Sequence, residues 1–69
     1  METTYLNCQS WQYRYNRCQA PGRIVAAQLT RQESNQPCYE GQSWGYDNDA
    51  VWVNAGCRGS FLVQYYPRF

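Results

Sequence analysis

The chain has 69 residues and a formal net charge of +1, which comes from six basic and five acidic residues with no histidine. This charge falls far short of the basic excess with which proteins neutralise nucleic-acid phosphates, so we expect no nucleic-acid partner. No apolar run approaches the roughly twenty residues that span a bilayer. A chain this short forms a single domain, residues 1–69, whose small core needs covalent staples.

The first part of the chain is predicted to form strands. Thr3–Asn7 alternates polar and apolar residues and makes a fair first strand. The next segment, Gln9–Tyr15, places Trp11, Tyr13 and Tyr15 on one face, which is the period of two expected for a strand. A helix is therefore not expected in this region.

The middle of the chain is predicted to contain a turn, a strand and a loop. Gln19–Gly22 is the turn, because Pro fixes φ and Gly can adopt a positive φ. Arg23–Thr30 favours a strand through Ile24 and Val25, although its Ala-Ala-Gln-Leu portion would suit a helical turn. Arg31–Pro37 is polar and is expected to form a loop.

The last third is predicted to be a hairpin. Ala50–Val53 and Ser60–Tyr66 are rich in β-branched and aromatic residues, and they flank Asn54–Gly56, whose Asn and Gly suit a turn with positive φ. One face around the second run should point into the core, and it carries Cys57, Gly59, Phe61 and Val63. The end, Tyr65–Phe69, is expected to be a fraying tail. We therefore expect an all-β fold, a small disulfide-stapled antiparallel sheet or sandwich with no helix longer than a turn.

A short motif occurs twice in the chain. Gln9–Tyr13 and Gln42–Tyr46 both have the pattern Gln-Ser-Trp-x-Tyr. A duplication would make the fold two repeated β-motifs around one core, whereas chance repetition in a chain rich in Gln, Ser and aromatic residues is the alternative. Both interpretations remain open from the sequence.

Four cysteines in a short chain with no histidine and no Cys-x-x-Cys pair indicate two disulfides rather than a zinc site. We expect neither a metal nor a cofactor. Of the three possible pairings we predict Cys8–Cys57 with Cys18–Cys38, because joining the first strand to the last would close the sheet. Persistent disulfides indicate a secreted or periplasmic protein. Met1–Thr4 lacks the basic start and apolar run of a signal peptide, so we expect a mature domain behind a methionine or a fragment of something larger.

A set of short motifs runs from Cys8 to Phe61: Cys-x-Ser early, Trp-Gly-x-Asp in the middle and Trp-Val-x-x-Gly-Cys-Arg near the end. The residues that carry it are Cys8, Ser10, Cys18, Arg31, Gln32, Ser34, Cys38, Gly41, Trp44, Gly45, Asp47, Trp52, Val53, Gly56, Cys57, Arg58 and Phe61. The pattern resembles the small bacterial domain-of-unknown-function family 3011. That resemblance implies a secreted or periplasmic, disulfide-bonded β-domain and brings no activity with it.

A fainter likeness is to the Greek keys of βγ-crystallins. It rests on Val53-x-x-Gly56 and on Tyr39-x-Gly41-x-Ser43. The calcium-ligand pattern of that family is missing here, so the likeness does not imply a calcium site.

The clustered acids Asp47 and Asp49 flank Asn48 and form the first candidate site. They could accept hydrogen bonds from sugar hydroxyls or bind calcium, or they could form an ordinary turn, because a tripeptide supplies fewer oxygens than the six or so that calcium needs. Aromatic side chains beside them could stack on a sugar ring, although Trp44 could instead belong to the core, where we also expect Trp52. The predicted contact patch is Gln42, Trp44, Tyr46, Asp47, Asn48 and Asp49, and the repeated motif predicts a second patch of Gln9, Trp11 and Tyr13.

Catalysis is not expected, because the chain has no histidine or lysine and its cysteines are assigned to disulfides. Aromatic residues make up 17% of the chain, and tyrosine and tryptophan concentrate at binding surfaces. We therefore expect a non-catalytic, lectin-like module that binds a glycan or cell-wall polysaccharide. The alternative is a secreted protein-interaction module, such as a small inhibitor or antimicrobial effector. The sequence does not indicate an oligomeric state.

Overall fold

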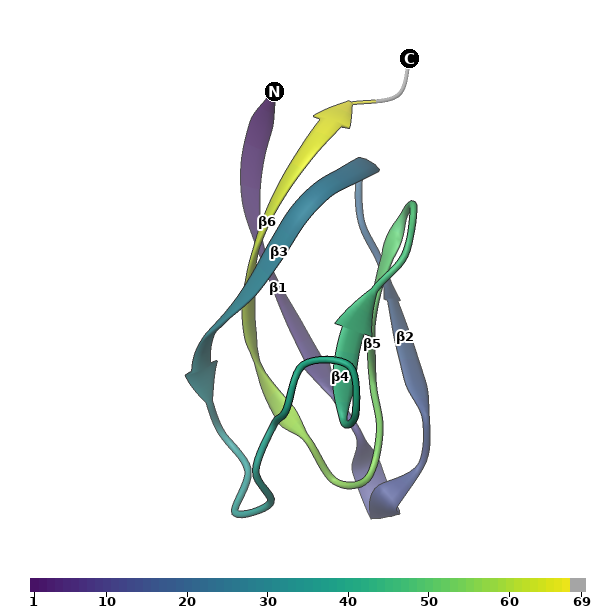
Figure 1. Ribbon diagram of the computed structural model, residues 1–69, viewed down its shortest axis with the longest axis vertical. Coiled ribbons are helices and arrows are strands. Elements are labelled where there is room, and N and C mark those ends of the chain that lie inside the picture. The colour runs from purple at the N-terminus through teal and green to yellow at the C-terminus, as the bar shows by residue number, and fades with distance from the viewer. Residues whose placement is uncertain (68–69) are drawn as a thin grey trace.

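The computed structural model describes residues 1–67, which form six strands and one short 3-10 turn. The elements are β1 (Glu2–Gln9), η1 (Trp11–Tyr13), β2 (Asn16–Gln19), β3 (Gly22–Gln32), β4 (Trp44–Tyr46), β5 (Ala50–Val53) and β6 (Arg58–Pro67). They make two three-stranded antiparallel sheets, β1-β6-β3 and β2-β5-β4, which face each other as a sandwich (Figure 1). The predicted all-β fold is confirmed.

The larger sheet is built around β6, with β1 and β3 paired along its two edges. Gly59, Phe61 and Val63 alternate along β6 and are buried, as the period of two predicts. The register of β3 shifts between Ile24 and Ala26 and again between Leu29 and Arg31. Such irregularities bend a strand and allow this sheet to curve over the smaller one.

The core lies between the two sheets and draws on both. Val51 and Val53 of β5 are fully buried, and Trp44 of β4 is only 3% exposed. The indole of Trp44 lies against Phe61 of the opposite sheet, with ring centroids 4.8 Å apart. This aromatic contact joins the two layers at the centre of the domain.

The predicted hairpin between β5 and β6 is wrong. The turn itself has the expected backbone, since Ala55 and Gly56 have φ values of 54° and 86°. However, β5 pairs with β2 and β4, whereas β6 pairs with β1 and β3. The turn thus crosses from one sheet to the other, and the two apolar runs that suggested a pair are facing walls of one core.

The predicted disulfide pairing is also wrong, although all four cysteines are bonded as expected. The bonds are Cys8–Cys18, with Cα atoms 5.9 Å apart, and Cys38–Cys57, with Cα atoms 5.2 Å apart. β1 and β6 are already hydrogen-bonded neighbours, so no covalent link is needed to close that edge. Each bond instead joins segments that the backbone ladders leave apart, β1 to β2 and the loop before β4 to the turn that leads into β6.

The repeated Gln-Ser-Trp-x-Tyr motif does not mark a structural repeat. Its first copy forms η1 with Trp11 exposed, whereas its second copy leads into β4 with Trp44 buried. Each sheet also takes strands from both halves of the chain. The likeness between the two segments is therefore one of sequence only.

Two further segments differ from their predicted form. Gln9–Tyr15 is not a continuous strand, because η1 interrupts it. The predicted tail is part of the paired strand β6 as far as Pro67, while Arg68 and Phe69 lie outside the described residues. The strand predicted at Arg23–Thr30 is confirmed as the central part of β3.

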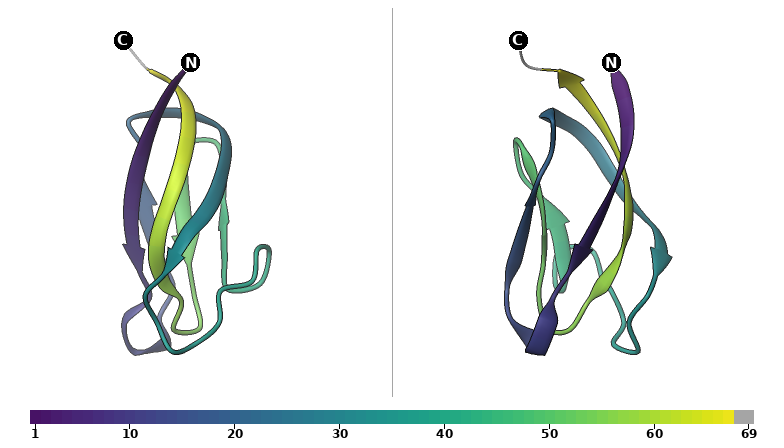
Figure 2. Two further views of the ribbon diagram at one scale, coloured as in Figure 1. Left: turned by 90° about the vertical axis from the view of Figure 1, so that its left-hand side faces the viewer. Right: turned by 180° about the vertical axis from the view of Figure 1, so that it is seen from behind.

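The two ends of the sandwich carry different parts of the chain. The start of β1 and the end of β6 meet at one end (Figures 1 and 2). Three connections gather at the opposite end, namely residues 10–15, 33–37 and 54–57. The second and third are joined near this end by the Cys38–Cys57 bond.

Candidate functional site

A groove of about 310 Å³ lies among these three connections. Its walls are η1, the loop residues 34–36 and the turn that leads into β6. Trp11 and Tyr13, which the sequence placed in the second candidate patch, are 58% and 64% exposed. The groove therefore presents two large aromatic side chains to the solvent.

The backbone of η1 adopts a rare conformation. Gln12 and Tyr13 have φ values of 56° and 62°, in the left-handed region that few residues other than glycine enter. Such strain costs on the order of 1–3 kcal/mol for each residue and persists only where the surroundings hold it. The chain passes here from β1 to β2, in the opposite sheet, and this tight reversal is why the predicted strand is absent.

Two buried serines hold the walls of the groove together. The hydroxyl of Ser10 donates to the carbonyl of Arg14 at 2.6 Å and accepts from the backbone N–H of Gly56 at 3.1 Å. The hydroxyl of Ser34 donates to the carbonyl of Gln36 at 2.6 Å and accepts from the N–H of Arg58 at 3.2 Å. Each serine thus closes its own loop and ties that loop to the chain around the start of β6, Ser10 at the turn before the strand and Ser34 at its first residue.

Side chains in the groove are also held in place by one another. The guanidinium carbon of Arg58 lies 4.8 Å from the centre of the Trp11 ring, a cation–π contact. The amide of Gln36 donates to the hydroxyl of Tyr13 at 3.2 Å. The space beside this pair depends on Gly56, since a Cβ there would lie 2.9 Å from Gln36 and 3.1 Å from Tyr13. The aromatic side chains are therefore oriented before any ligand arrives.

The first candidate patch is not assembled as predicted. Trp44 belongs to the core and cannot stack on a ligand in this structure. Tyr46 is 38% exposed, and Gln42 is exposed in the turn before β4. Asp47, Asn48 and Asp49 form the turn between β4 and β5, which lies toward the end with the termini (Figure 1). The two predicted patches thus occupy opposite ends of the domain.

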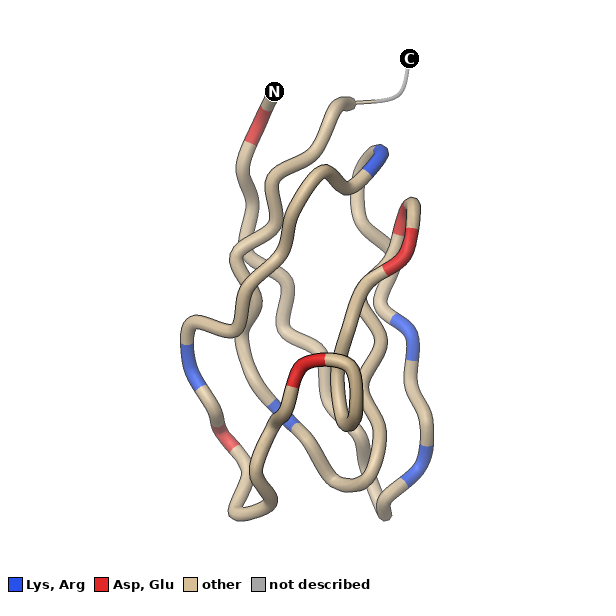
Figure 3. Tube along the Cα trace, in the orientation of Figure 1, with Lys and Arg blue, Asp and Glu red and all other residues tan. Residues whose placement is uncertain are grey.

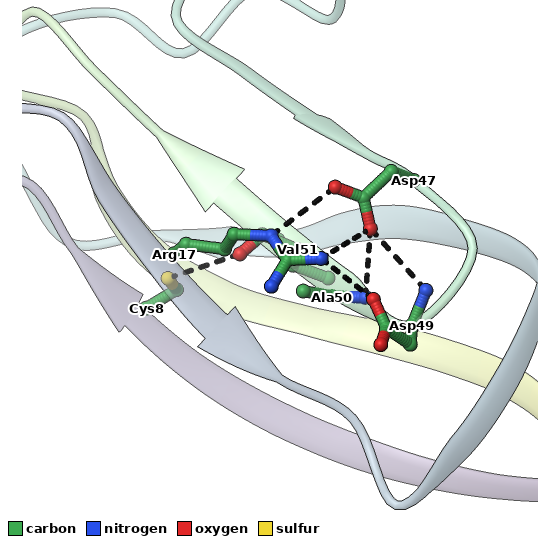
Figure 4. A network of polar contacts seen from close by, with 6 residues as sticks. All are labelled: Cys8, Arg17, Asp47, Asp49, Ala50 and Val51. Carbon is green, nitrogen blue, oxygen red and sulfur yellow. Dashed lines mark hydrogen bonds and ion pairs between the residues drawn. The ribbon is translucent and has the colours of Figure 1, made fainter.

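The acidic turn is engaged within the protein. Nε and one terminal nitrogen of Arg17 donate to the two oxygens of the Asp47 carboxylate at 3.2 and 3.0 Å, and the same terminal nitrogen reaches Asp49 at 2.6 Å (Figure 4). Asp47 also accepts from the backbone N–H groups of Asp49 and Ala50. In this geometry Asp47 and Asp49 act as turn-forming residues, the alternative to ligand binding that the sequence left open.

The ion pair fixes the charge state of this turn. The hydrogen bond from Arg17 lowers the pKa of Asp47 below 3.8 against the opposing effect of burial, and the backbone N–H donors and the positive charge of Arg17 lower it further. The hydrogen bond to Asp47 in turn raises the pKa of Arg17. Both groups are therefore charged at neutral pH.

Comparison with known proteins matches residues 1–62 to a family described as "Protein of unknown function (DUF3011)". The chain belongs to the DUF3011 family. This DUF3011 domain is also similar to Lectin ADEL of Aplysia dactylomela, with 33% identity over 66 residues. That alignment covers 93% of the chain and 30% of the lectin, so the domain spans less than a third of the relative's length. No solved structure matches the domain significantly.

Several groove residues of this DUF3011 domain were missed from the sequence. Gln12, Asn35, Gln36 and Arg58 line the groove beside Trp11. The amide-rich run before Cys38 was a signal, but it was interpreted only as a loop. Arg58 could not be assigned, because its meeting with Trp11 depends on the crossing of the chain between sheets.

The described residues hold neither a cluster of metal ligands nor a helix that could span a membrane. Within residues 1–67, no group of three or more metal-ligating side chains comes together. The same residues contain no helix long and apolar enough to cross a membrane.

Proposed function

We propose that this DUF3011 domain is a non-catalytic carbohydrate-binding module and that a sugar ring stacks on Trp11 in the end groove. The observation that carries the proposal is the exposed, pre-oriented pair of Trp11 and Tyr13 beside amide and guanidinium groups. The similarity to a protein named as a lectin supports the same class of ligand.

The chemistry of the groove suits a pyranose. The C–H face of a sugar ring is apolar and can pack on an indole, while its hydroxyls need hydrogen-bond partners at the edge of the contact. Gln12, Asn35 and Gln36 supply both donors and acceptors, and Arg58 supplies donors. Because Ser10 and Ser34 already hold the loops, little conformational entropy is lost when a ligand binds.

A secreted or periplasmic location is part of the proposal. Two disulfides indicate an oxidising environment. Extracellular and cell-wall polysaccharides are the glycans available there, so they form the ligand class that we expect.

The test is Trp11→Ala, assayed on a glycan array that includes bacterial polysaccharides and then by titration with the best ligand. We expect binding to weaken by about 1–2 kcal/mol, or roughly 5- to 30-fold, because the stacking surface is lost. The melting temperature should change little, since Trp11 is 58% exposed.

Tyr5→Ala is the matched control. Tyr5 is a large aromatic residue that is 68% exposed, but it lies in β1, outside the groove lining. This variant should bind as the wild type does. Equal binding by wild type and Trp11→Ala, or an equal loss in both variants, would contradict the proposed site.

A protein partner is the second candidate, favoured by the Trp11–Arg58 pair. Tryptophan and arginine are the residues most enriched in interface hot spots. A protein would bury about 800 Å² of this domain, far more than the groove alone offers. Substitutions on the exposed surface outside the groove, such as Tyr5→Ala, should therefore weaken the binding of a protein partner. They should leave the binding of a sugar unchanged.

A further inference from the structure

The outer face of the β2-β5-β4 sheet carries a second aromatic surface. Trp52 was expected in the core, but it is only half-buried and points away from the sandwich, opposite to the buried Val51 and Val53. Its register partners are Arg17 on β2 and Gly45 on β4. A Cβ at Gly45 would lie 2.5 Å from the indole, so the absence of a side chain there lets the ring lie close to the sheet.

A second ring extends this surface. The ring of Tyr15 is nearly parallel to that of Trp52, with an interplanar angle of 21° and centroids 6.1 Å apart. Beside Trp52 lies an open hollow of about 380 Å³, lined by Glu40, Gly41, Gly45, Tyr46 and Trp52. None of these lining residues also lines the end groove. The two surfaces are therefore separate.

The charges around the two surfaces have opposite signs. Among the ionised residues that line the groove, within the described part of the chain, Arg58 is a cation and none is a carboxylate. Glu40 lines the hollow beside Trp52, and Asp47 and Asp49 share the single positive charge of Arg17, so these four residues together carry two net negative charges. Figure 3 shows how the acidic and basic positions are distributed along the trace. Arg17 is paired with the two aspartates, and Glu40 takes part in neither ion pair.

We propose that this outer face is a second carbohydrate contact, selective for sugars that carry a free, protonated amino group, such as oligomers of glucosamine. The proposal rests on the proposed carbohydrate-binding function and names a ligand class for a surface outside the groove. The C–H face of the pyranose packs on Trp52, and its ammonium group lies in the negative field of Glu40 and the aspartate pair. The electron-rich face of the indole also attracts the cation.

The test uses tryptophan fluorescence in a Trp11→Phe background. Trp44 is buried, so Trp52 is then the tryptophan that reports on ligands at the outer face. The glucosamine tetramer is compared with the N-acetylglucosamine tetramer, which has the same ring but no positive charge. We expect the glucosamine tetramer to bind at least about fivefold more tightly, and added salt should weaken it.

Glu40→Gln removes one negative charge from the hollow while keeping the shape of the side chain. We expect it to weaken binding of the glucosamine tetramer about threefold and to leave binding of the neutral tetramer unchanged. Glu2→Gln is the matched control, because it makes the same charge change on β1 in the other sheet. It should have no effect.

The outcomes separate this proposal from the function of the groove. If the glucosamine tetramer leaves Trp52 fluorescence unchanged while glycans still bind in a Trp11-dependent way, the second contact is overturned and the groove function stands. Equal affinity for the two tetramers also overturns it. Choline, a quaternary ammonium compound that carries a positive charge but no sugar ring, is the third probe, and equal affinity for choline and the glucosamine tetramer would show that the sugar ring is not recognised, which overturns the proposal as well. If the glucosamine tetramer changes Trp52 fluorescence but no glycan binds in a Trp11-dependent way, the second contact is supported and the proposed function of the groove is overturned.

Discussion

Trp11 and Trp44 follow the same two residues, Gln and Ser, yet they do opposite things in the domain. Ser10 and Ser43 are both buried, and each hydroxyl bonds to loop backbone. The residues after each serine decide the outcome. Left-handed backbone at Gln12 and Tyr13 turns the first tryptophan outward, whereas β4 pairing carries the second into the core.

Trp44→Ala tests the core role at this position. Removing the buried indole leaves a cavity between the sheets, and we expect it to lower the free energy of unfolding by about 3–5 kcal/mol. Trp44→Phe keeps an aromatic contact with Phe61 and should cost less. Urea denaturation with the disulfides intact measures both. A Trp44→Ala variant as stable as the wild type would show that the indole does not hold the sheets together.

Asp47→Asn tests the ion pair through pH. The folded-state pKa of Asp47 lies below the ordinary 3.8, so the carboxylate adds stability above that pH and loses it as pH falls through the lower folded value. Asn keeps the shape without the charge. The variant should therefore melt below the wild type at pH 7, and the two curves should converge in strong acid. Arg17→Gln should show the same convergence, while a gap that persists at every pH would argue against the ion pair.

At the scale of the elements, the loops at the groove end are held by a mixture of covalent and polar links. Cys38–Cys57 joins two connections, Ser10 ties its loop to the turn before β6, and Ser34 ties its loop to Arg58, the first residue of β6. Cys8–Cys18 links β1 to β2 on either side of η1. The strained backbone of η1 is thus held from both of its flanks.

Peptide mapping under non-reducing conditions should recover Cys8 joined to Cys18 and Cys38 joined to Cys57. The bonds close loops with sequence separations of 10 and 19 residues. In the chain-entropy model, replacing either pair by serine should cost about 3 kcal/mol, a large part of the stability of so small a domain. Detection of a Cys8–Cys57 peptide would contradict this topology.

The sequence predicts local structure in this domain better than it predicts which strands pair with each other and which cysteines are bonded. The period of two in Cys57, Gly59, Phe61 and Val63 identified the buried face of β6, and the turn at Asn54–Gly56 was placed correctly. The same pattern does not say whether the strand beyond the turn folds back in the same sheet or crosses to the other. The hairpin and the disulfide pairing both depended on that choice, and both were wrong.

The candidate site was predictable to a similar extent. Trp11 and Tyr13 were singled out as aromatic residues at strand spacing, although they are not in a strand. Gln36 lies 23 residues after Tyr13 in the sequence, and Arg58 lies further still. Only the folding of the loops brings these two residues to the groove. Trp52 was assigned to the core because it lies at the centre of a predicted strand, but its alternation with Val51 and Val53 already required it to face outward.

At the scale of the whole molecule, the sandwich is long and narrow, with extents of 36, 18 and 17 Å. The groove lies at one tip of the long axis, and the outer face with Trp52 lies along one flank. Ligands at the two places would approach from different directions. If both contacts operate, one domain of this size could link two strands of a polymer.

The ends of the described chain and the groove lie at opposite ends of this elongated domain, and this arrangement determines how the domain can be attached to a solid support. Both the start of β1 and the end of β6 lie away from the groove tip (Figures 1 and 2). A sensor chip that captures the domain through a peptide tag at either end should therefore leave the groove facing the flowing solution. The two capture orientations should give equal ligand capacity per mole of immobilised protein. Random coupling through surface carboxylates, which include those of the outer face, should give less.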